Sequence, residues 1–182
     1  METGIAPILH EAMLTPAELP GWSPVANPLA AESPFSHTVH SDRFIEEASV
    51  RLEKDETGEV LVQHIGVLSP PELATLEQDL AVPAISADQP EMLDESPHEA
   101  WAVAPLQLPP LAEQAVSFRL IGGLEDSRFL LADNVYMRRG CVALALVRID
   151  PDVRQASGRS IEPLATLADR KLAVAAEKIG AG

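Results

Sequence analysis

Apolar and polar residues alternate along several stretches of the chain, as they do in strands that bury one face. Between residues 47 and 53, Ala48, Val50 and Leu52 alternate with polar or charged neighbours. The same alternation predicts further strands over residues 60–68, 100–106, 115–121, 128–137 and 141–149. In the last of them both alternating sets are apolar, which indicates burial on two faces. Short turn sequences join several strands, so we predict a largely antiparallel sheet of five to six strands.

Apolar residues at helical spacing predict three helices around this sheet. They cover residues 5–14, 69–81 and 161–179. Ser69 is a typical N-terminal cap for the middle helix, and Gly180 suits the end of the last one. Proline-rich stretches at about residues 20–44 and 82–99 show no period and are interpreted as irregular loops. The predicted fold class is therefore α+β, a single domain over residues 1–182 with an N-terminal, a middle and a C-terminal helix packed on the sheet.

The charge of the chain restricts the partners that it can have. Acidic residues outnumber basic ones 28 to 13, which gives a net charge of −15. Nucleic acids and anionic membrane surfaces are held by Lys and Arg, so we predict no nucleic-acid partner. No uncharged apolar run approaches the ~18 residues of a membrane-spanning helix. The single cysteine, Cys141, cannot form an internal disulfide.

Four short sequences carry a resemblance to a known group of proteins. They are MLTPAELPGWSP, LPPLAEQAVSFRL, VYMRRGCVALALV and LATLADRKLA. Together they resemble exported proteins of actinobacteria and Chloroflexota that are similar to LpqN-type lipoproteins and to the extracellular sensor domain of PknH-type kinases. The resemblance implies a PsbP-like fold, in which helices pack against an antiparallel sheet. It also implies a non-catalytic domain outside the cytoplasm, secreted or tethered by a membrane anchor upstream of this sequence, with a cleft for an unknown ligand.

The sequence departs from this group in two places. Ala112, Glu113 and Gln114 stand where the group has glycine, aspartate and glutamate at the entry to a strand. Cys141 has no partner for the disulfides that PknH-type domains carry. The first residues also lack the basic and apolar pattern of an export signal. The alternative hypothesis is therefore a cytoplasmic protein that starts at Met1.

Several residues are candidates for a ligand site in a cleft beside the sheet. They are Trp22, Trp101, Arg119, Arg128, Tyr136 and Arg138. An aromatic in a proline-rich or strand-edge segment can line a cleft, although for both tryptophans we favour a role in sealing the core. The arginines and the tyrosine could share one sheet face and receive an anionic ligand. Cross-strand pairing with the plentiful acids is the interpretation that we prefer.

Two adjacent arginines, Arg138 and Arg139, precede Gly140 and Cys141 between the last two predicted strands. A tight hairpin needs a residue with positive φ, and glycine adopts this conformation without strain. We interpret both arginines as polar turn residues. Cys141 is interpreted as a small hydrophobe at the start of a buried strand.

His37, His40 and Asp42 are the candidate metal ligands, because imidazole and carboxylate groups bind divalent cations. They lie in a predicted loop without a helical scaffold, so a solvated polar loop is the preferred interpretation and no cofactor is predicted. No sequence frames a serine as a nucleophile elbow does.

These patterns together favour a non-catalytic, extracytoplasmic ligand-binding or sensor domain. It would hold an unknown small ligand or protein partner in a cleft beside the sheet. One alternative is a cytoplasmic protein-interaction domain without a small ligand. A hydrolase with a dispersed site is the less favoured alternative.

Overall fold

The described part of the chain folds into one antiparallel sheet with two helices. The computed structural model describes residues 4–25, 44–69, 101–123, 129–151 and 159–180. Its strands are β1 (Trp22–Pro24), β2 (Phe44–Lys54), β3 (Val60–Leu68), β4 (Trp101–Pro105), β5 (Gln114–Gly123), β6 (Phe129–Arg139) and β7 (Val142–Asp150). They lie in the order β1-β2-β3-β7-β6-β5-β4, and each neighbouring pair is antiparallel. The helices of the described residues are α1 (Ile5–Glu11) and α4 (Glu162–Gly180).

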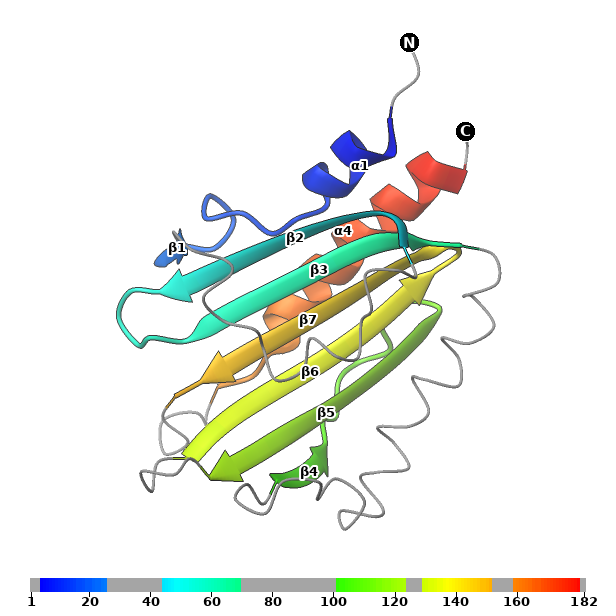
Figure 1. Cartoon of the computed structure of the whole chain (residues 1–182). Coiled ribbons are helices and arrows are strands. Elements are labelled where there is room, and N and C mark those ends of the chain that lie inside the picture. The colour runs from blue at the N-terminus through cyan, green and yellow to red at the C-terminus, as the bar shows by residue number, and fades with distance from the viewer. Residues whose placement is uncertain (1–3, 26–43, 70–100, 124–128, 152–158, 181–182) are drawn as a thin grey trace.

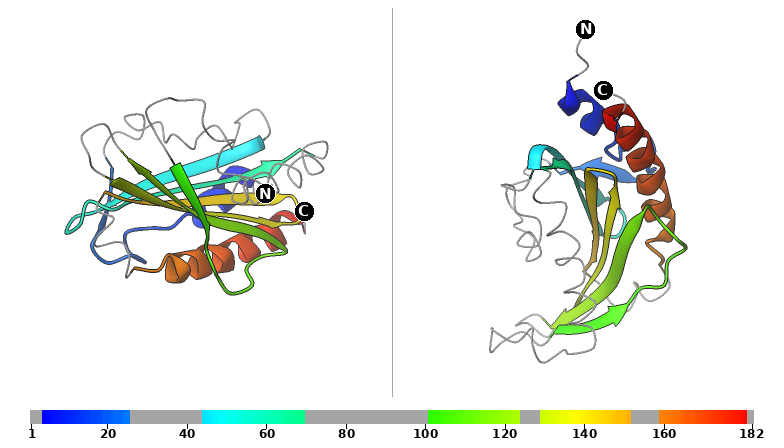
Figure 2. Two further views of the ribbon diagram at one scale, coloured as in Figure 1. Left: turned by 90° about the horizontal axis from the view of Figure 1, so that it is seen from below. Right: turned by 90° about the vertical axis from the view of Figure 1, so that its right-hand side faces the viewer.

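The sheet consists of two meanders that meet at its centre. The first contains β1, β2 and β3, the second runs from β4 to β7, and β3 pairs with β7 between them (Figure 1). Both helices lie on the same face of the sheet, with α4 against β6 and β7 and α1 beside β2 (Figure 2). We call this the helix face. Because successive strand residues point to opposite faces, the strand register decides which residues meet on it.

The main core lies between the helix face and α4. On α4 the buried residues follow helical spacing: Ala165, Ala168, Leu172 and Ala175. On the sheet they are matched by aliphatic residues, among them Leu61, Ile65, Val135, Met137, Leu144 and Leu146. The small alanine side chains allow the helix to approach the sheet closely, so that the larger sheet residues fill the space between them.

α1 is shorter than the helix predicted over residues 5–14, because a buried side chain binds the main chain after Glu11. Gln63 of β3 is fully buried. Its Oε1 accepts a hydrogen bond from the Leu14 N–H at 2.7 Å, and its Nε2 donates to the Ala12 carbonyl at 3.2 Å. These bonds replace the helical ones that would otherwise continue, and they fix the end of α1 to the sheet.

The α+β class and the antiparallel pairing are confirmed, whereas the predicted strand number is corrected to seven. The additional strand, β1, lies within residues 20–44, for which the sequence predicts a loop. Its three residues are too few for a recognisable alternation, and their strand conformation depends on pairing with the end of β2. The predicted helix at residues 69–81, apart from Ser69, and the predicted loop at 82–99 lie outside the described residues. The single domain over residues 1–182 stays a prediction.

The hairpin between β6 and β7 confirms the predicted conformation of Gly140, whose φ is +55°. Arg139 pairs with Val142, so the two-residue loop consists of Gly140 and Cys141. A glycine with positive φ at the first loop position is typical of a type II′ turn. Arg138 and Arg139 therefore both belong to β6 and not to the turn, and Cys141 lies in the turn and not in β7, which corrects the predicted placement of all three residues.

Candidate functional site

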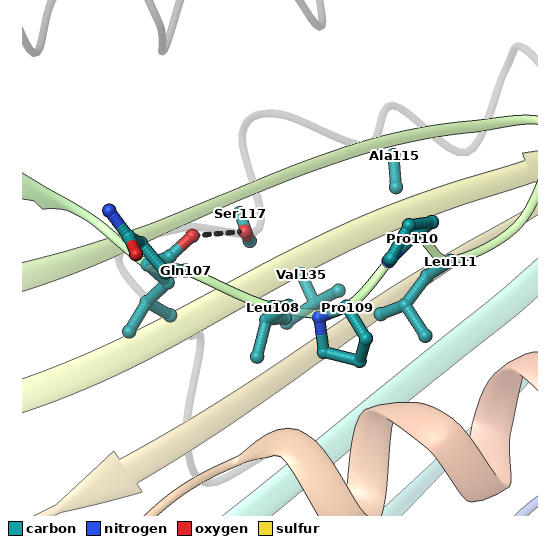
Figure 3. A pocket seen from close by; sticks show the side chains of 9 residues that line it. Gln107, Leu108, Pro109, Pro110, Leu111, Ala115, Ser117 and Val135 are labelled. Carbon is teal, nitrogen blue, oxygen red and sulfur yellow. Dashed lines mark hydrogen bonds between the residues drawn. The ribbon is translucent and has the colours of Figure 1, made fainter.

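A pocket of about 420 Å³ opens on the helix face beside β5 and β6 (Figure 3). One wall is the segment of residues 106–111, which follows β4 and runs across this face. The lining residues are Leu106, Gln107, Leu108, Pro109, Pro110, Leu111, Ala115, Ser117 and Val135. Small-molecule sites usually span ~300–1,000 Å³, so the pocket is large enough for a small organic ligand.

Two prolines explain why this segment leaves the edge of the sheet. Directly after β4, the Leu106 N–H still donates to the Ser117 carbonyl at 3.3 Å, and the Ser117 hydroxyl donates to the Leu106 carbonyl at 2.9 Å. Pro109 and Pro110 have no N–H group and cannot extend this ladder. The chain therefore turns away from β5 and crosses the helix face.

Leu111 and Ala112 fix the far end of the segment. Leu111 is buried in the main core. Ala112 has a φ of +53°, a left-handed conformation that costs a non-glycine residue roughly 1–2 kcal/mol. It turns the chain back, so that the Glu113 N–H donates to the Arg138 carbonyl where β5 begins. The buried leucine on one side and the sheet on the other hold this strained residue in place.

The pocket is apolar at one end and polar at the other (Figure 3). Pro110, Leu111 and Ala115 lie at the apolar end, whereas Gln107 and Ser117 lie at the opposite end. The hydrogen of the serine hydroxyl is already donated to the main chain, which leaves its oxygen as an acceptor. The glutamine amide carries both donors and an acceptor. The arrangement therefore suits a molecule with an aliphatic body and one polar group.

A buried ion cluster lies on the helix face beyond the polar end of the pocket. Arg119 follows Ser117 on the same face of β5 and pairs in register with Asp133 of β6. Its Nε and Nη2 donate to Asp133 Oδ1 and Oδ2 at 2.6 and 3.1 Å. Arg148 of β7 donates from Nη2 to Asp133 Oδ2 at 2.5 Å. Two guanidinium groups thus share one carboxylate that is 0% exposed.

The cluster carries more positive than negative charge. The hydrogen bond to Asp133 raises the pKa of Arg119 above its already high value, so this guanidinium remains charged. Arg148, which is 3% exposed, also donates to the Arg159 carbonyl at 2.9 Å. Its Nε is buried and has no hydrogen-bond partner among the described residues. The charge of Arg148 also acts on the buried carboxylate of Glu59, so the excess positive charge lies on the side of Arg119, whose side chain is 22% exposed.

A second group of charges lies one row further along the sheet. It contains two acidic and two basic side chains. Glu59 is 2% exposed, with Oε1 3.1 Å from Arg159 Nη1 and Oε2 3.6 Å from Lys54 Nζ. Asp150 Oδ2 lies 3.7 Å from the same Arg159 nitrogen. Burial raises the pKa of Glu59, but the hydrogen bond and charge of Arg159, together with the charges of Lys54 and Arg148, outweigh it and hold this pKa below its usual value.

The two tryptophans proposed for a common cleft lie at opposite edges of the sheet. Trp22 belongs to β1 and Trp101 to β4, the first and last strands in the sheet order. Trp22 is 9% exposed in the main core, and Lys54 Nζ lies 5.9 Å from the centroid of its ring. Trp22 therefore has the core-sealing role, and the side chain of Trp101 lies outside the described part.

Arg119, Tyr136 and Arg138 do not form a stripe on one face, which corrects that hypothesis. The register places Arg119 on the helix face and the other two residues on the opposite face. There the Tyr136 ring stacks on Phe118 with centroids 6.0 Å apart, and Arg138 Nε donates to Gln114 Oε1 at 2.8 Å. The preferred alternative, cross-strand pairing with an acid, is confirmed for Arg119.

Four further candidates, Arg128, His37, His40 and Asp42, lie outside the described residues. In the described ranges, no group of three or more His, Cys, Asp or Glu residues is arranged to hold a metal ion. The helices of this part of the chain are also too short or too polar to cross a membrane.

The residues that sequence reasoning missed are Gln107, Ser117, Asp133 and Arg148. A partial signal for the ion cluster exists in β7, where Arg148 interrupts an otherwise apolar run. A charge in a strand with two apolar faces needs a buried partner, so this residue could have been identified. Gln107 and Ser117 have no such signal, because their proximity depends on the path of the proline segment.

Comparison with known proteins adds no assignment to this geometry. No protein-family model matches the chain, and no curated protein matches it. The proposals below therefore rest on the residues and geometry of this chain.

Proposed function

We propose that this chain is a ligand-binding domain that holds a small, largely aliphatic molecule in the pocket beside β5 and β6. The observation that carries the proposal is the polarity of the pocket. Seven of its nine lining residues have apolar side chains, whereas main-chain atoms and the two polar side chains make up the larger part of its open surface. Apolar walls with a few convergent polar groups are typical of small-molecule sites. Such a pocket orients a ligand as well as holding it.

Binding without chemistry is the function that these contacts favour. A hydrolytic serine needs a base beside it, whereas the hydroxyl of Ser117 donates to the Leu106 carbonyl. Both oxygens of the nearby Asp133 already accept hydrogen bonds from Arg119 and Arg148, so this carboxylate is engaged with the arginines and not with Ser117. The domain would therefore act by holding its ligand, as a carrier or a sensor.

We further propose that the domain is PsbP-like and acts outside the cytoplasm, either secreted or attached by an anchor upstream of this sequence. The antiparallel sheet with α1 and α4 on one face supports the proposed fold. Ala112 supports it as well, because its φ of +53° occurs where the resembled proteins carry glycine. Protease treatment of intact source cells tests the location. We expect digestion before lysis, and full protection until lysis would contradict the proposal.

Titration of the purified protein with hexanol, followed by amide NMR, tests the pocket. We expect saturable shifts at Leu108, Ser117 and Val135, which line it. The Ala115→Phe substitution fills the apolar end and should remove these shifts. Ser49→Phe, at an exposed position of β2, is the matched control and should leave them unchanged. Shifts that do not saturate, or that persist in Ala115→Phe, would contradict the proposed function.

A further inference from the structure

We propose that the ligand of this pocket is a small aliphatic carboxylate, whose acid group lies at the polar end between the donors of Gln107 and Arg119. The inference rests on the proposed function, because it names a class of molecule for the same pocket. The carboxylate would offset the charge of the buried cluster, while the aliphatic chain would lie against the leucine and proline walls.

The position of Arg119 on β5 brings it near the polar end of the pocket. Arg119 is the next residue after Ser117 on the helix face of β5, so their Cα atoms lie ~6.6–6.8 Å apart. Figure 3 places Ser117 and Gln107 at the end of the pocket toward which β5 continues. The Arg119 side chain is 22% exposed. Arg119 does not itself line the pocket, so the carboxylate would extend from the polar end toward its guanidinium.

The hydrogen bonds of Arg119 leave donors for a ligand. Nε and Nη2 bind Asp133, and Nη1 has no hydrogen-bond partner among the described residues. A guanidinium held by two parallel bonds cannot rotate away, so its remaining N–H groups keep a fixed direction. Gln107 adds amide donors at the same end of the pocket. Together these groups form a site that donates hydrogen bonds, as a carboxylate requires.

The charge of the cluster favours an anion over a cation. Asp133 supplies one negative charge to Arg119 and Arg148. The buried Nε of Arg148, without a hydrogen-bond partner in the described part, shows that the guanidinium pair is incompletely satisfied. A bound carboxylate would add a charged hydrogen-bond partner to the partly exposed Arg119. An alkylammonium ion would instead meet a like charge.

The walls of the pocket restrict the remainder of the ligand. Leu108, Pro109 and Leu111 offer apolar side chains, which suit an alkyl chain, while the polar atoms that make up the larger share of the open lining suit its head group. One net positive charge also matches one carboxylate better than a phosphate, which carries up to two negative charges. The observations therefore favour an aliphatic monocarboxylate.

Calorimetric titration with three probes of equal chain length tests this assignment: hexanoate, hexanol and hexylammonium. We expect hexanoate to bind about tenfold more tightly than hexanol, since a hydrogen bond to a charged group has this effect. Hexylammonium should bind more weakly than hexanol. Arg119→Gln should reduce the hexanoate affinity about tenfold and leave the hexanol affinity unchanged. Arg138→Gln, on the opposite face, is the matched control and should change none of the three affinities.

Each other outcome has a definite meaning. Equal affinities for hexanoate and hexanol would overturn the carboxylate assignment and leave the proposed function intact. A hexanoate preference that persists in Arg119→Gln would overturn the role of Arg119. Failure of all three probes to bind would overturn the proposed function itself. If Arg119→Gln does not fold, Gln107→Leu takes its place: a selective loss of hexanoate affinity supports the proposal, and an unchanged preference overturns it.

Discussion

Two pairs of arginines in this molecule show how differently charge can be placed in one sheet. Arg138 and Arg139 are adjacent in the sequence but point to opposite faces of β6. Arg138 bonds Gln114 across the sheet, whereas Arg139 forms a bidentate pair with Asp169 of α4, with both bonds at 2.9 Å. The two side chains therefore never meet, and together they do not form a site.

Arg119 and Arg148 are far apart in the sequence, yet they meet on one carboxylate. The register of β5, β6 and β7 places both beside Asp133 on the helix face. In a sheet, register and not proximity in the sequence decides which charges interact. The surroundings also differ, because Asp133 is 0% exposed and the Asp169 side chain is 14% exposed. Breaking the buried cluster should cost far more than breaking the pair on α4.

Asp133→Ala is expected to have the largest effect on stability. It leaves Arg119 and Arg148 without their shared carboxylate, and one of these guanidinium groups is buried. Removing one partner of a buried ion pair usually lowers the free energy of unfolding by about 3–5 kcal/mol. Urea unfolding followed by circular dichroism measures the change. A loss below about 1 kcal/mol would show that the cluster is solvated like a surface pair.

The turn that separates Arg138 and Arg139 from β7 can be weakened without changing either ion pair. Gly140→Ala should cost about 1–2 kcal/mol, because the left-handed φ disfavours a side chain. An added Cβ meets no atom within 4 Å, so the cost comes from the backbone alone. Ala112→Gly is the inverse experiment and should stabilise the protein by about 0.5–1 kcal/mol. Thermal unfolding of both variants measures these changes in stability. Destabilisation by Ala112→Gly would refute the conformational explanation.

Asp169→Ala tests the partly exposed ion pair between Arg139 and α4. We expect a loss of at most about 1 kcal/mol, because water solvates Arg139 once its partner is removed. The loss should shrink in high salt, which screens exposed charges. Urea unfolding at two ionic strengths provides the measurement. A cost as large as that of Asp133→Ala would mean that burial does not distinguish the two regions.

The pH dependence of stability extends the comparison to Glu59, with the smallest expected effect. Its pKa in the folded protein lies below the reference value of 4.5. The stabilisation from this carboxylate is therefore present above that value and is lost as the pH falls through the folded pKa. Glu59→Gln should flatten the acid side of the curve of unfolding free energy against pH. An equally steep curve in the variant would exclude Glu59 as a source of the slope.

The regular elements of the fold could be predicted from the sequence because their patterns are local. β3 has the predicted bounds, residues 60–68, and α4 lies within one residue of its prediction at each end. Alternation and helical spacing determine such elements before any tertiary contact is considered. β1 could not be predicted, because its three residues form a strand only through pairing with β2.

The candidate site was harder to predict from the sequence, because it depends on contacts between residues that are distant in the chain. No local pattern in residues 106–111 predicts that this segment crosses the helix face. Its path follows from the bonds between Leu106 and Ser117 and from the left-handed Ala112. Asp133 resembles any other charge in a strand until the register places Arg119 opposite it. A rule that seeks buried partners for charges in apolar strands would have found part of this cluster.

Native mass spectrometry of the protein purified from its source tests the ligand-binding function most directly. We predict a non-covalent complex whose additional mass disappears on denaturation and corresponds to a small aliphatic carboxylic acid. The Ala115→Phe variant, expressed and purified in the same way, should carry no additional mass, whereas Ser49→Phe should retain it. The bare polypeptide mass under native conditions, or a ligand retained equally by Ala115→Phe, would contradict the assignment of this pocket.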